Sequence, residues 1–344
     1  MATTVTHIVD PDGGAGHDYD SLSLWEAGEQ GDLTGVRDEI AVAKCQCTGG
    51  TADGDFGFAG WDTSPSQYIK VWTDPAESYR HAGEYNATKF RIIGTNIDLV
   101  SVSQNSLNLK FDGIQFVSTM SGSWSPKAGI KFTAVNSCAV DISNCLLLSD
   151  ADSSGDYYYG ISLQGSSGSV GIIKIQNCVI AVTVAGDSAS AAVGVKAFSS
   201  SSASSIYLYN CTLKHLTTGV ETADSDAVYM RNCGLSNVDE KSSGNALAAD
   251  QTNSETTPTW LSGTLYHLDS TDTTWQDQGT DLSVITGIIE SKDIDGQVRS
   301  APWDIGADEY VAGGFTEGVD GIGPLLAGAA SRFAMLNRDL GGDF

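Results

Sequence analysis

The chain has 344 residues, of which 39 are Gly, 7 are Pro and 18% are charged, a composition that favours many short strands over a helical bundle. Its formal net charge of −25, from 43 acidic and 18 basic residues, should repel DNA, RNA and anionic lipid. The first residues show no basic region followed by an apolar run, and no stretch of about 18 apolar residues occurs. We therefore expect synthesis in the cytoplasm and neither nucleic-acid binding nor a membrane span.

Residues 1–37 are predicted to form an N-terminal cap. Residues 21–28 have the apolar spacing of a short amphipathic helix, with Leu22 and Trp25 on one side and with Ser23 and Glu26 at capping-box spacing. Such a helix could cover the open end of a repeat structure. Strand-like segments follow it at residues 39–43, 68–73, 89–93 and 97–102.

The strongest pattern in the sequence is an internal repeat of the form apolar-x-Asn-Cys-x-apolar. Its members are Asn144 and Cys145, Asn177 and Cys178, Asn210 and Cys211, and Asn232 and Cys233. Successive asparagines are 33, 33 and 22 residues apart, as expected when coils of one cross-section carry loops of different length. Asp112 and Gly113 occupy the same place one coil earlier. The pattern predicts an all-β fold, a right-handed parallel β-helix, over residues 38–311.

The repeated residues have expected structural roles. Each Asn lies between two strands, where the chain must turn, often through a left-handed conformation that Asn tolerates. Each Cys would begin the next strand and point into the core. Each coil also contains a glycine that we expect to permit the tight bend at the start of another strand. These glycines are Gly129, Gly160, Gly194 and Gly219.

The row of four cysteines is also a candidate metal site, because thiolates bind zinc and iron–sulfur clusters. Stacked coils would place the thiols in a line about 4.8 Å apart, however, whereas a closed zinc site needs a tetrahedron. Cys45 and Cys47 lack the C-x-x-C spacing. We predict buried structural thiols, with no metal and no cofactor.

A conspicuous motif precedes the end of the predicted solenoid. Asp293, Asp295 and Arg299 belong to a D-x-D-G-x-x-R pattern, and Asp304 begins D-I-G-A-x-E-Y. This pair of motifs resembles the closing segment of many pectate-lyase-like, right-handed parallel β-helix proteins. Residues 18–33 are similar to the start of a related group in environmental bacterial and bacteriophage sequences. The resemblance implies the fold and not the activity, because lyases, hydrolases, adhesins and structural proteins share this scaffold.

The closing motif permits two interpretations. Asp293, Asp295 and Arg299 could bind a cation or a sugar, but we expect an ion pair that seals the last coil.

Residues 312–344 lie outside the resemblance and are predicted to form a Gly-rich linker and a helix over residues 324–340. Its apolar side would either pack on the solenoid or dock on another subunit. That side consists of Leu325, Leu326, Ala329, Phe333 and Leu336.

The repeat region contains no pattern typical of a serine hydrolase, a zinc protease, a phosphate-binding loop or a dinucleotide site, so we predict no catalytic residues. The scattered lysines are expected to face outward and be solvated, and His215 to be a surface or turn residue; the lysines are Lys131, Lys174, Lys196 and Lys214. The acidic pairs that resemble hydrolase carboxylates are expected to be turns; they are Asp150 with Asp152 and Asp224 with Asp226. The candidate sugar platforms are Trp61, Trp72, Trp124 and residues 157–159.

These observations lead to one primary hypothesis and two alternatives. The primary hypothesis is a non-enzymatic structural virion protein, a bacteriophage capsid decoration or fibre component on the particle surface that contacts glycans. It would bind other virion proteins through its C-terminal tail and form a homo-oligomer such as a trimer. The alternatives are a tailspike-like polysaccharide depolymerase, acting as a lyase or hydrolase, and an extracellular glycan-binding adhesin.

Overall fold

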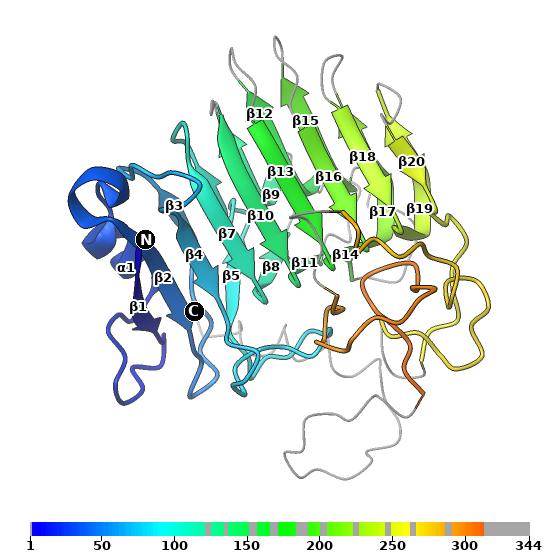
Figure 1. The fold of residues 1–344 in the computed structure, drawn as a ribbon, viewed down its shortest axis with the longest axis horizontal. Helices are drawn as coiled ribbons and strands as arrows, with labels where there is room; N and C mark the ends of the chain where they lie inside the picture. The colour runs from blue at the N-terminus through cyan, green and yellow to red at the C-terminus, as the bar shows by residue number, and fades with distance from the viewer. Residues whose placement is uncertain are drawn as a thin grey trace, which may run out of the picture.

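The computed structural model describes most of the chain before the predicted tail. The described residues are 2–120, 125–133, 137–150, 157–165, 171–183, 192–199, 205–222, 227–244, 249–261, 266–285 and 291–312. Their strands pair in parallel, coil after coil, and build an elongated solenoid (Figure 1). The predicted tail, with its apolar residues 325–336, lies outside the described residues.

Each complete coil contributes strands to three faces. Sheet A consists of β1 (Thr3–Val9), β2 (Glu39–Cys45), β4 (Ile69–Trp72), β7 (Asn108–Asp112), β10 (Cys138–Ser143), β13 (Gly171–Gln176), β16 (Ser205–Tyr209), β18 (Ala227–Arg231) and β20 (Ala249–Gln251). Face B consists of β5 (Arg91–Thr95), β8 (Gln115–Thr119), β11 (Leu146–Ser149), β14 (Val179–Val182) and the first parts of β17 (Thr212–Thr222) and β19 (Gly234–Ser243). Face C consists of β3 (Phe56–Phe58), β6 (Val100–Val102), β9 (Lys127–Thr133), β12 (Tyr158–Gly165), β15 (Ala192–Ser199) and the later parts of β17 and β19.

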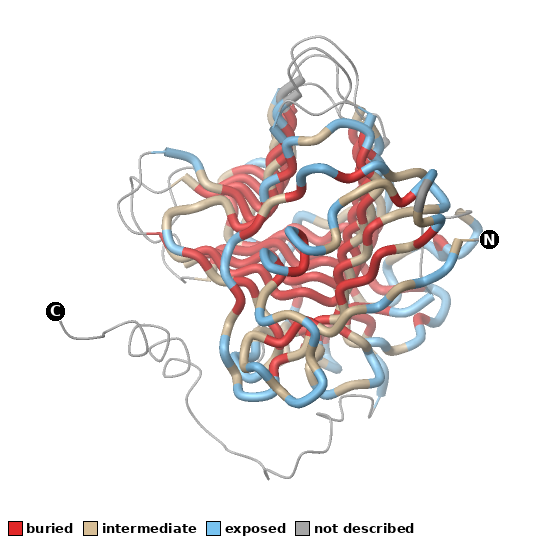
Figure 2. The backbone as a smooth tube through the Cα atoms, turned by 90° about the vertical axis from the view of Figure 1, so that its left-hand side faces the viewer, coloured by how far each residue is buried: buried red, intermediate tan, exposed pale blue. Residues whose placement is uncertain are grey.

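The core consists of in-register rows of apolar side chains. In sheet A, for example, Val140, Ile173, Ile206 and Val228 are register partners on successive strands and are at most 1% exposed. Viewed along the solenoid, the buried backbone forms stacked layers between the faces (Figure 2). Alternating apolar residues thus bury one side of each strand over the whole length. The predicted right-handed parallel β-helix is confirmed.

The repeat motif lies at the corner between sheet A and face B. Asn144, Asn177, Asn210 and Asn232 all have φ between 50° and 53°, the left-handed conformation that Asn tolerates better than most residues. Gly113 takes the place of the asparagine one coil earlier, with φ 74°. The predicted alignment of Asp112 with the asparagines was wrong by one residue, because the strand register pairs Asp112 with Ser143. The cysteine that follows each Asn is completely buried, and all seven cysteines are free thiols. The motif therefore turns the chain sharply and fills the space just inside the turn.

The glycine row has a different role from the one expected. Gly129 and Gly194 lie within strands of face C, and neither has a positive φ. A Cβ on Gly194 would lie 2.6 Å from the backbone oxygen of Gly219 in the next coil, and a Cβ on Gly129 would lie 2.9 Å from that of Gly160. The prediction of tight bends was therefore wrong: glycine is needed here because adjacent coils approach too closely for a side chain.

Helix α1 (Leu22–Glu29) lies at the N-terminal end of the solenoid (Figure 1). Leu22 and Trp25 are completely buried in the core, as their spacing predicted. The predicted capping box was wrong, because Ser21 caps the helix by accepting a hydrogen bond from Leu24 N at 3.2 Å. Glu26 instead accepts hydrogen bonds from Ala59 N and Trp61 Nε1. A π-helical turn (Leu33–Arg37) connects this helix to β2.

The closing segment, which we define as residues 266–285 and 291–312, lies beside the coils. Its residues Tyr266, Ile294 and Ala307 pack on the outer side chains of face B, Leu146, Leu148, Val179 and Ala181. Trp275 lies against the position of Gly234, where a Cβ would be 2.1 Å from the indole ring. The segment thus crosses several coils along face B. The expectation that it seals the last coil was wrong, because its apolar residues match the outer surface of face B.

Candidate functional site

The outer surface of sheet A carries an ordered row of polar and aromatic side chains. The register aligns one residue from each of six successive strands, and we call this set the outer row. Its members, in order along the solenoid, are Lys70, Lys110, Asp141, Lys174, Tyr207 and Tyr229. All six side chains are half-buried, as expected for residues that stand side by side on a sheet.

Aromatic rings accompany the lysines at one end of the outer row and replace them at the other. Lys70 Nζ lies 3.9 Å from the ring centroid of Trp72, and Lys110 Nζ lies 4.3 Å from that of Tyr68. Tyr207 and Tyr229 stack with centroids 4.8 Å apart and an interplanar angle of 11°. The row therefore presents ammonium groups over aromatic rings and then the polar edges of two stacked phenols.

The two carboxylates on this surface are engaged by cations. Asp112 is 2.8 Å from Arg80 and 3.6 Å from Lys70, and it accepts a hydrogen bond from Asn144 Nδ2 at 3.0 Å. Asp141 is 3.6 Å from Lys110. Both carboxylates therefore serve as ion-pair partners of the neighbouring cations.

Two segments border the outer row on the side where the sheet A strands end (Figure 1). The loop between β4 and β5 supplies Arg80 near the lysine end. The closing segment lies beside the tyrosine end, where Leu282 and Trp303 cover Tyr209 and Tyr207 packs against the same cluster. Residues far apart in the sequence therefore form one side of this surface.

The closing segment is fixed to the asparagine row by hydrogen bonds. Asn177 Nδ2 donates to Lys292 O at 2.7 Å, and Arg299 donates to Asn177 Oδ1 at 3.3 Å. Asn232 exchanges two hydrogen bonds with the Thr280 backbone, at 2.7 and 2.9 Å. The asparagines also contact one another, with Asn177 Nδ2 3.3 Å from Asn144 Oδ1. The same side chains that turn the coils therefore hold the segment in place.

The buried ion pair of the closing segment differs from the expected one. Arg299 pairs with Glu309 at 3.3 Å and also donates to the backbone oxygens of Gly306 and Ala307. Asp293 and Asp304 instead accept backbone hydrogen bonds, Asp293 from Gln297 N and Glu309 N, and Asp304 from Asp277 N and Tyr310 N. The prediction that Asp293 or Asp295 pairs with Arg299 was wrong, because Glu309 folds back beside the guanidinium.

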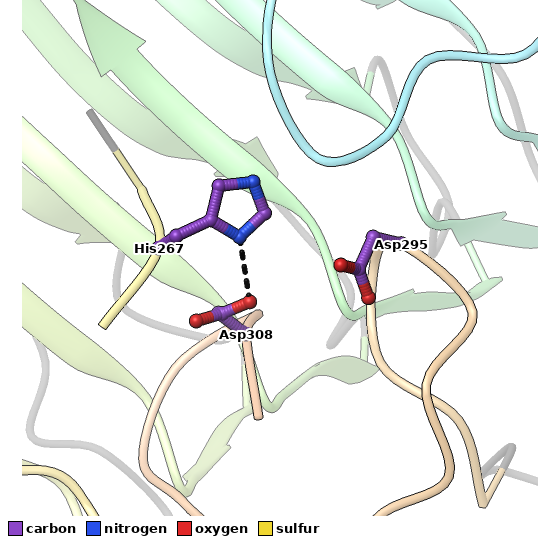
Figure 3. A group of neighbouring side chains, drawn as sticks. All are labelled: His267, Asp295 and Asp308. Atoms are coloured by element: carbon purple, nitrogen blue, oxygen red, sulfur yellow. Dashed lines mark hydrogen bonds and ion pairs between the residues drawn. The ribbon is translucent and has the colours of Figure 1, made fainter. Parts of the chain in front are cut away.

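The closing segment meets the β4–β5 loop at a histidine that the sequence did not single out. His267 Nδ1 is 2.8 Å from Asp308 Oδ1 (Figure 3). His267 Nε2 is 3.1 Å from Ala82 O. Asp295 completes a group of three whose ligand atoms all lie within 4.8 Å of one another. Burial opposes the charge of His267, but the hydrogen bond and negative charge of Asp308 outweigh it and raise its pKa to about 9.

Burial changes the ionisation of other groups in this region. Desolvation, with the charge of Asp295 beside it, raises the pKa of Asp293, and desolvation raises the pKa of Asp304 to about 7. His81 is 3% exposed, and burial next to Arg80 lowers its pKa to about 3. The neutral His81 accepts a hydrogen bond from Gly83 N through Nδ1 at 3.1 Å, which positions the Ala82–Gly83 peptide.

The remaining sequence candidates are dispersed. Lys131 pairs with Asp98, and Lys196 pairs with Glu221 on face C. Lys214 is buried on face B with Nζ 4.6 Å from the Trp260 ring centroid, and burial lowers its pKa to about 8. The prediction that Lys214 is solvated was therefore wrong, because aromatic residues of later segments cover it. Strand β17 bends at His215, which has φ 54°, and passes there from face B to face C.

Among the proposed sugar platforms, Trp72 lies beside the outer row. Trp61 and Tyr158 are buried in the core, whereas Tyr159 packs on Val193. Asp150 accepts a hydrogen bond from Met120 N. Trp124, Asp152, Asp224 and Asp226 lie outside the described residues.

Comparisons with known proteins show the limits of homology for this chain. No protein-family model matches the sequence, and no curated protein matches it either. A solved structure of the pectin methylesterase from Aspergillus niger in deglycosylated form is similar to it, with 11% identity, a TM-score of 0.31, and coverage of 77% of this chain and 94% of that chain. This likeness is too weak to support an argument about activity.

In the part of the chain that the structure describes, no helix combines the length and apolarity needed to cross a bilayer.

Proposed function

We propose that this protein binds an anionic polysaccharide along the outer row of sheet A. The observation that carries the proposal is the row itself: three lysines, Asp141 and two stacked tyrosines, aligned on six consecutive coils, in a protein with a net charge of −25. At about 4.8 Å per coil, the row extends over roughly 24 Å. It is suited to an extended chain of repeating units.

The chemistry of the row favours acidic sugars. Ammonium groups bind carboxylates and sulfates through charge-assisted hydrogen bonds, while tyrosine combines apolar area with a hydroxyl that can bond to sugar hydroxyls. Counting the outer row alone, three lysines and Asp141 give a local charge of +2. Outside this row the chain is strongly acidic, which disfavours a wide polyanion such as duplex nucleic acid more than a narrow polyuronate chain that contacts the row alone.

The test measures binding of the full chain to an immobilised polyuronate and to a neutral glucan at low and high salt. We expect saturable binding to the polyuronate that weakens as salt rises. Lys110→Ala and Lys174→Ala should each raise the Kd about 5- to 10-fold, equivalent to about 1–1.4 kcal/mol. Lys131→Ala is the matched control, since this lysine lies on face C, and it should bind like the unaltered protein.

Three results would count against the proposal: no binding to any anionic glycan, equal binding to the neutral glucan, or an equal loss in the Lys131→Ala control. Each reaction is also analysed for new reducing ends and unsaturated products. Turnover that disappears on Asp112→Asn or Asp141→Asn would assign a depolymerase in place of a binding protein.

The virion role stays a prediction from sequence. It depends on docking through residues 325–336, which lie outside the described residues, and on the resemblance to bacteriophage sequences. Oligomeric state and localisation are likewise predictions, and copurification with assembled particles tests all three.

A further inference from the structure

We propose that His267, Asp308 and Asp295 bind one divalent cation of the zinc or manganese class. The ion would connect three parts of the closing segment to one another, beside the β4–β5 loop. The site is independent of the outer row and of polysaccharide binding. It combines two observations: the surroundings of the imidazole ring and a converging third ligand.

The first observation is the orientation of His267. Its Nε2 faces the carbonyl oxygen of Ala82 at 3.1 Å, so Nε2 carries the proton and donates. In the neutral ring Nδ1 then presents a lone pair to Asp308 Oδ1 at 2.8 Å, and two lone pairs attract only when a proton or a cation lies between them. A histidine that donates one N–H to a backbone carbonyl and offers its other nitrogen is typical of metal ligation.

The carbonyl that orients His267 is itself held by a second histidine. His81 Nδ1 accepts the Gly83 N–H at 3.1 Å, and this N–H belongs to the same peptide unit as the Ala82 carbonyl. Gly83 has φ 75°, and a Cβ there would lie 2.8 Å from His267 Cε1. The ring is therefore fixed on the side away from the proposed ion, as metal sites require of their outer contacts.

The second observation is the converging ligand set. Asp308 Oδ2 accepts Leu268 N at 2.8 Å, which leaves Oδ1 directed at the His267 ring. Asp295 lies across a gap from this pair, with one carboxylate oxygen turned toward it (Figure 3). All three ligand atoms lie within 4.8 Å of one another. Ligand atoms at about 2.0–2.2 Å from one ion are at most about 4.4 Å apart, so binding would draw the Asp295 side chain slightly toward the other two ligands.

The ligand types indicate which cation is bound. One imidazole nitrogen with two carboxylates suits zinc or manganese, whereas calcium prefers six or more oxygen ligands. His267 and Asp308 are buried and Asp295 is half-buried, so the ion can enter on the Asp295 side and retain water there. The ion would link three separate parts of the closing segment.

The experiment is calorimetric titration of the EDTA-treated full chain with ZnCl₂, MnCl₂ and CaCl₂, together with thermal unfolding. We expect one zinc or manganese ion per chain, affinity at least about 10-fold above that for calcium, and a higher melting temperature with the metal. Asp295→Asn should lower the affinity at least about 10-fold while circular dichroism stays unchanged, because this substitution leaves the His267–Asp308 contact intact. Asp281→Asn is the matched control, an exposed carboxylate of the same segment, and should change nothing.

Two outcomes would overturn the proposal. One is the absence of zinc and manganese binding up to about 1 mM. The other is binding that Asp295→Asn leaves unchanged, which would locate the ion elsewhere on the acidic surface. In either case the His267–Asp308 contact is an imidazolium–carboxylate pair.

Discussion

Asn177 both turns a coil and anchors the closing segment, so its replacement by Ala should destabilise the protein more than any ordinary turn substitution. The residue is completely buried and has φ 50°. Its side chain donates to Lys292 O and accepts from Arg299. Asn177→Ala removes both hydrogen bonds and leaves a β-carbon in a left-handed conformation.

The expected cost of Asn177→Ala is about 3–8 kcal/mol. The left-handed backbone contributes about 1–2 kcal/mol for Ala, and each buried polar group left without its partner contributes about 1–3 kcal/mol. Asn177→Gly separates the two effects, because glycine tolerates the backbone but supplies no side chain. It should cost about 1–2 kcal/mol less than Asn177→Ala.

Urea unfolding followed by tryptophan fluorescence measures these differences, since Trp275 and Trp303 lie in the closing segment. Asn237→Ala is the matched control: Asn237 has φ 53° but is exposed and accepts one surface hydrogen bond, from Thr257 Oγ1 at 3.3 Å, so it should show little more than the backbone cost. If Asn177→Ala proves no more damaging than Asn237→Ala, the asparagine row does not anchor the closing segment and the reasoning fails.

Three further predictions concern the coils. Gly194→Ala should destabilise by about 1–3 kcal/mol in urea unfolding, because its Cβ would lie 2.6 Å from Gly219 O; Gly54→Ala, where nothing lies within 4 Å, should be neutral. Lys214→Met should stabilise the protein at pH 7 by roughly 1–3 kcal/mol. Burial lowers the pKa of Lys214 from 10.5 to about 8, so the penalty for its charge develops as the pH falls through this range; an unaltered profile of stability against pH in Lys214→Met would contradict this. The cysteines should react with a thiol reagent only in denaturant, since all seven are buried and burial raises the pKa of Cys178 and Cys233; rapid labelling of the native protein would refute their burial.

The sequence alone determined the solenoid and its local chemistry. Asn144 and its three equivalents repeat because each turn needs a left-handed residue, and the cysteines repeat because each coil has the same small space inside that turn. Alternation of apolar residues in the strands, and the spacing of Leu22 and Trp25, likewise depend on neighbours close in sequence. Such features can be predicted because the local chain supplies most of the physical constraint.

Only the tertiary structure decided which residues meet between coils. Lys70, Lys110 and Lys174 are separated by 40 and 64 residues, and they form one row because the coil lengths place them in register. Gly194 is required by the backbone of the next coil, which its own neighbours do not reveal. His267 and Ala82 are 185 residues apart, and they meet because the closing segment folds back along face B. Contacts of this kind depend on how the coils stack, and the sequence pattern of a single coil does not specify them.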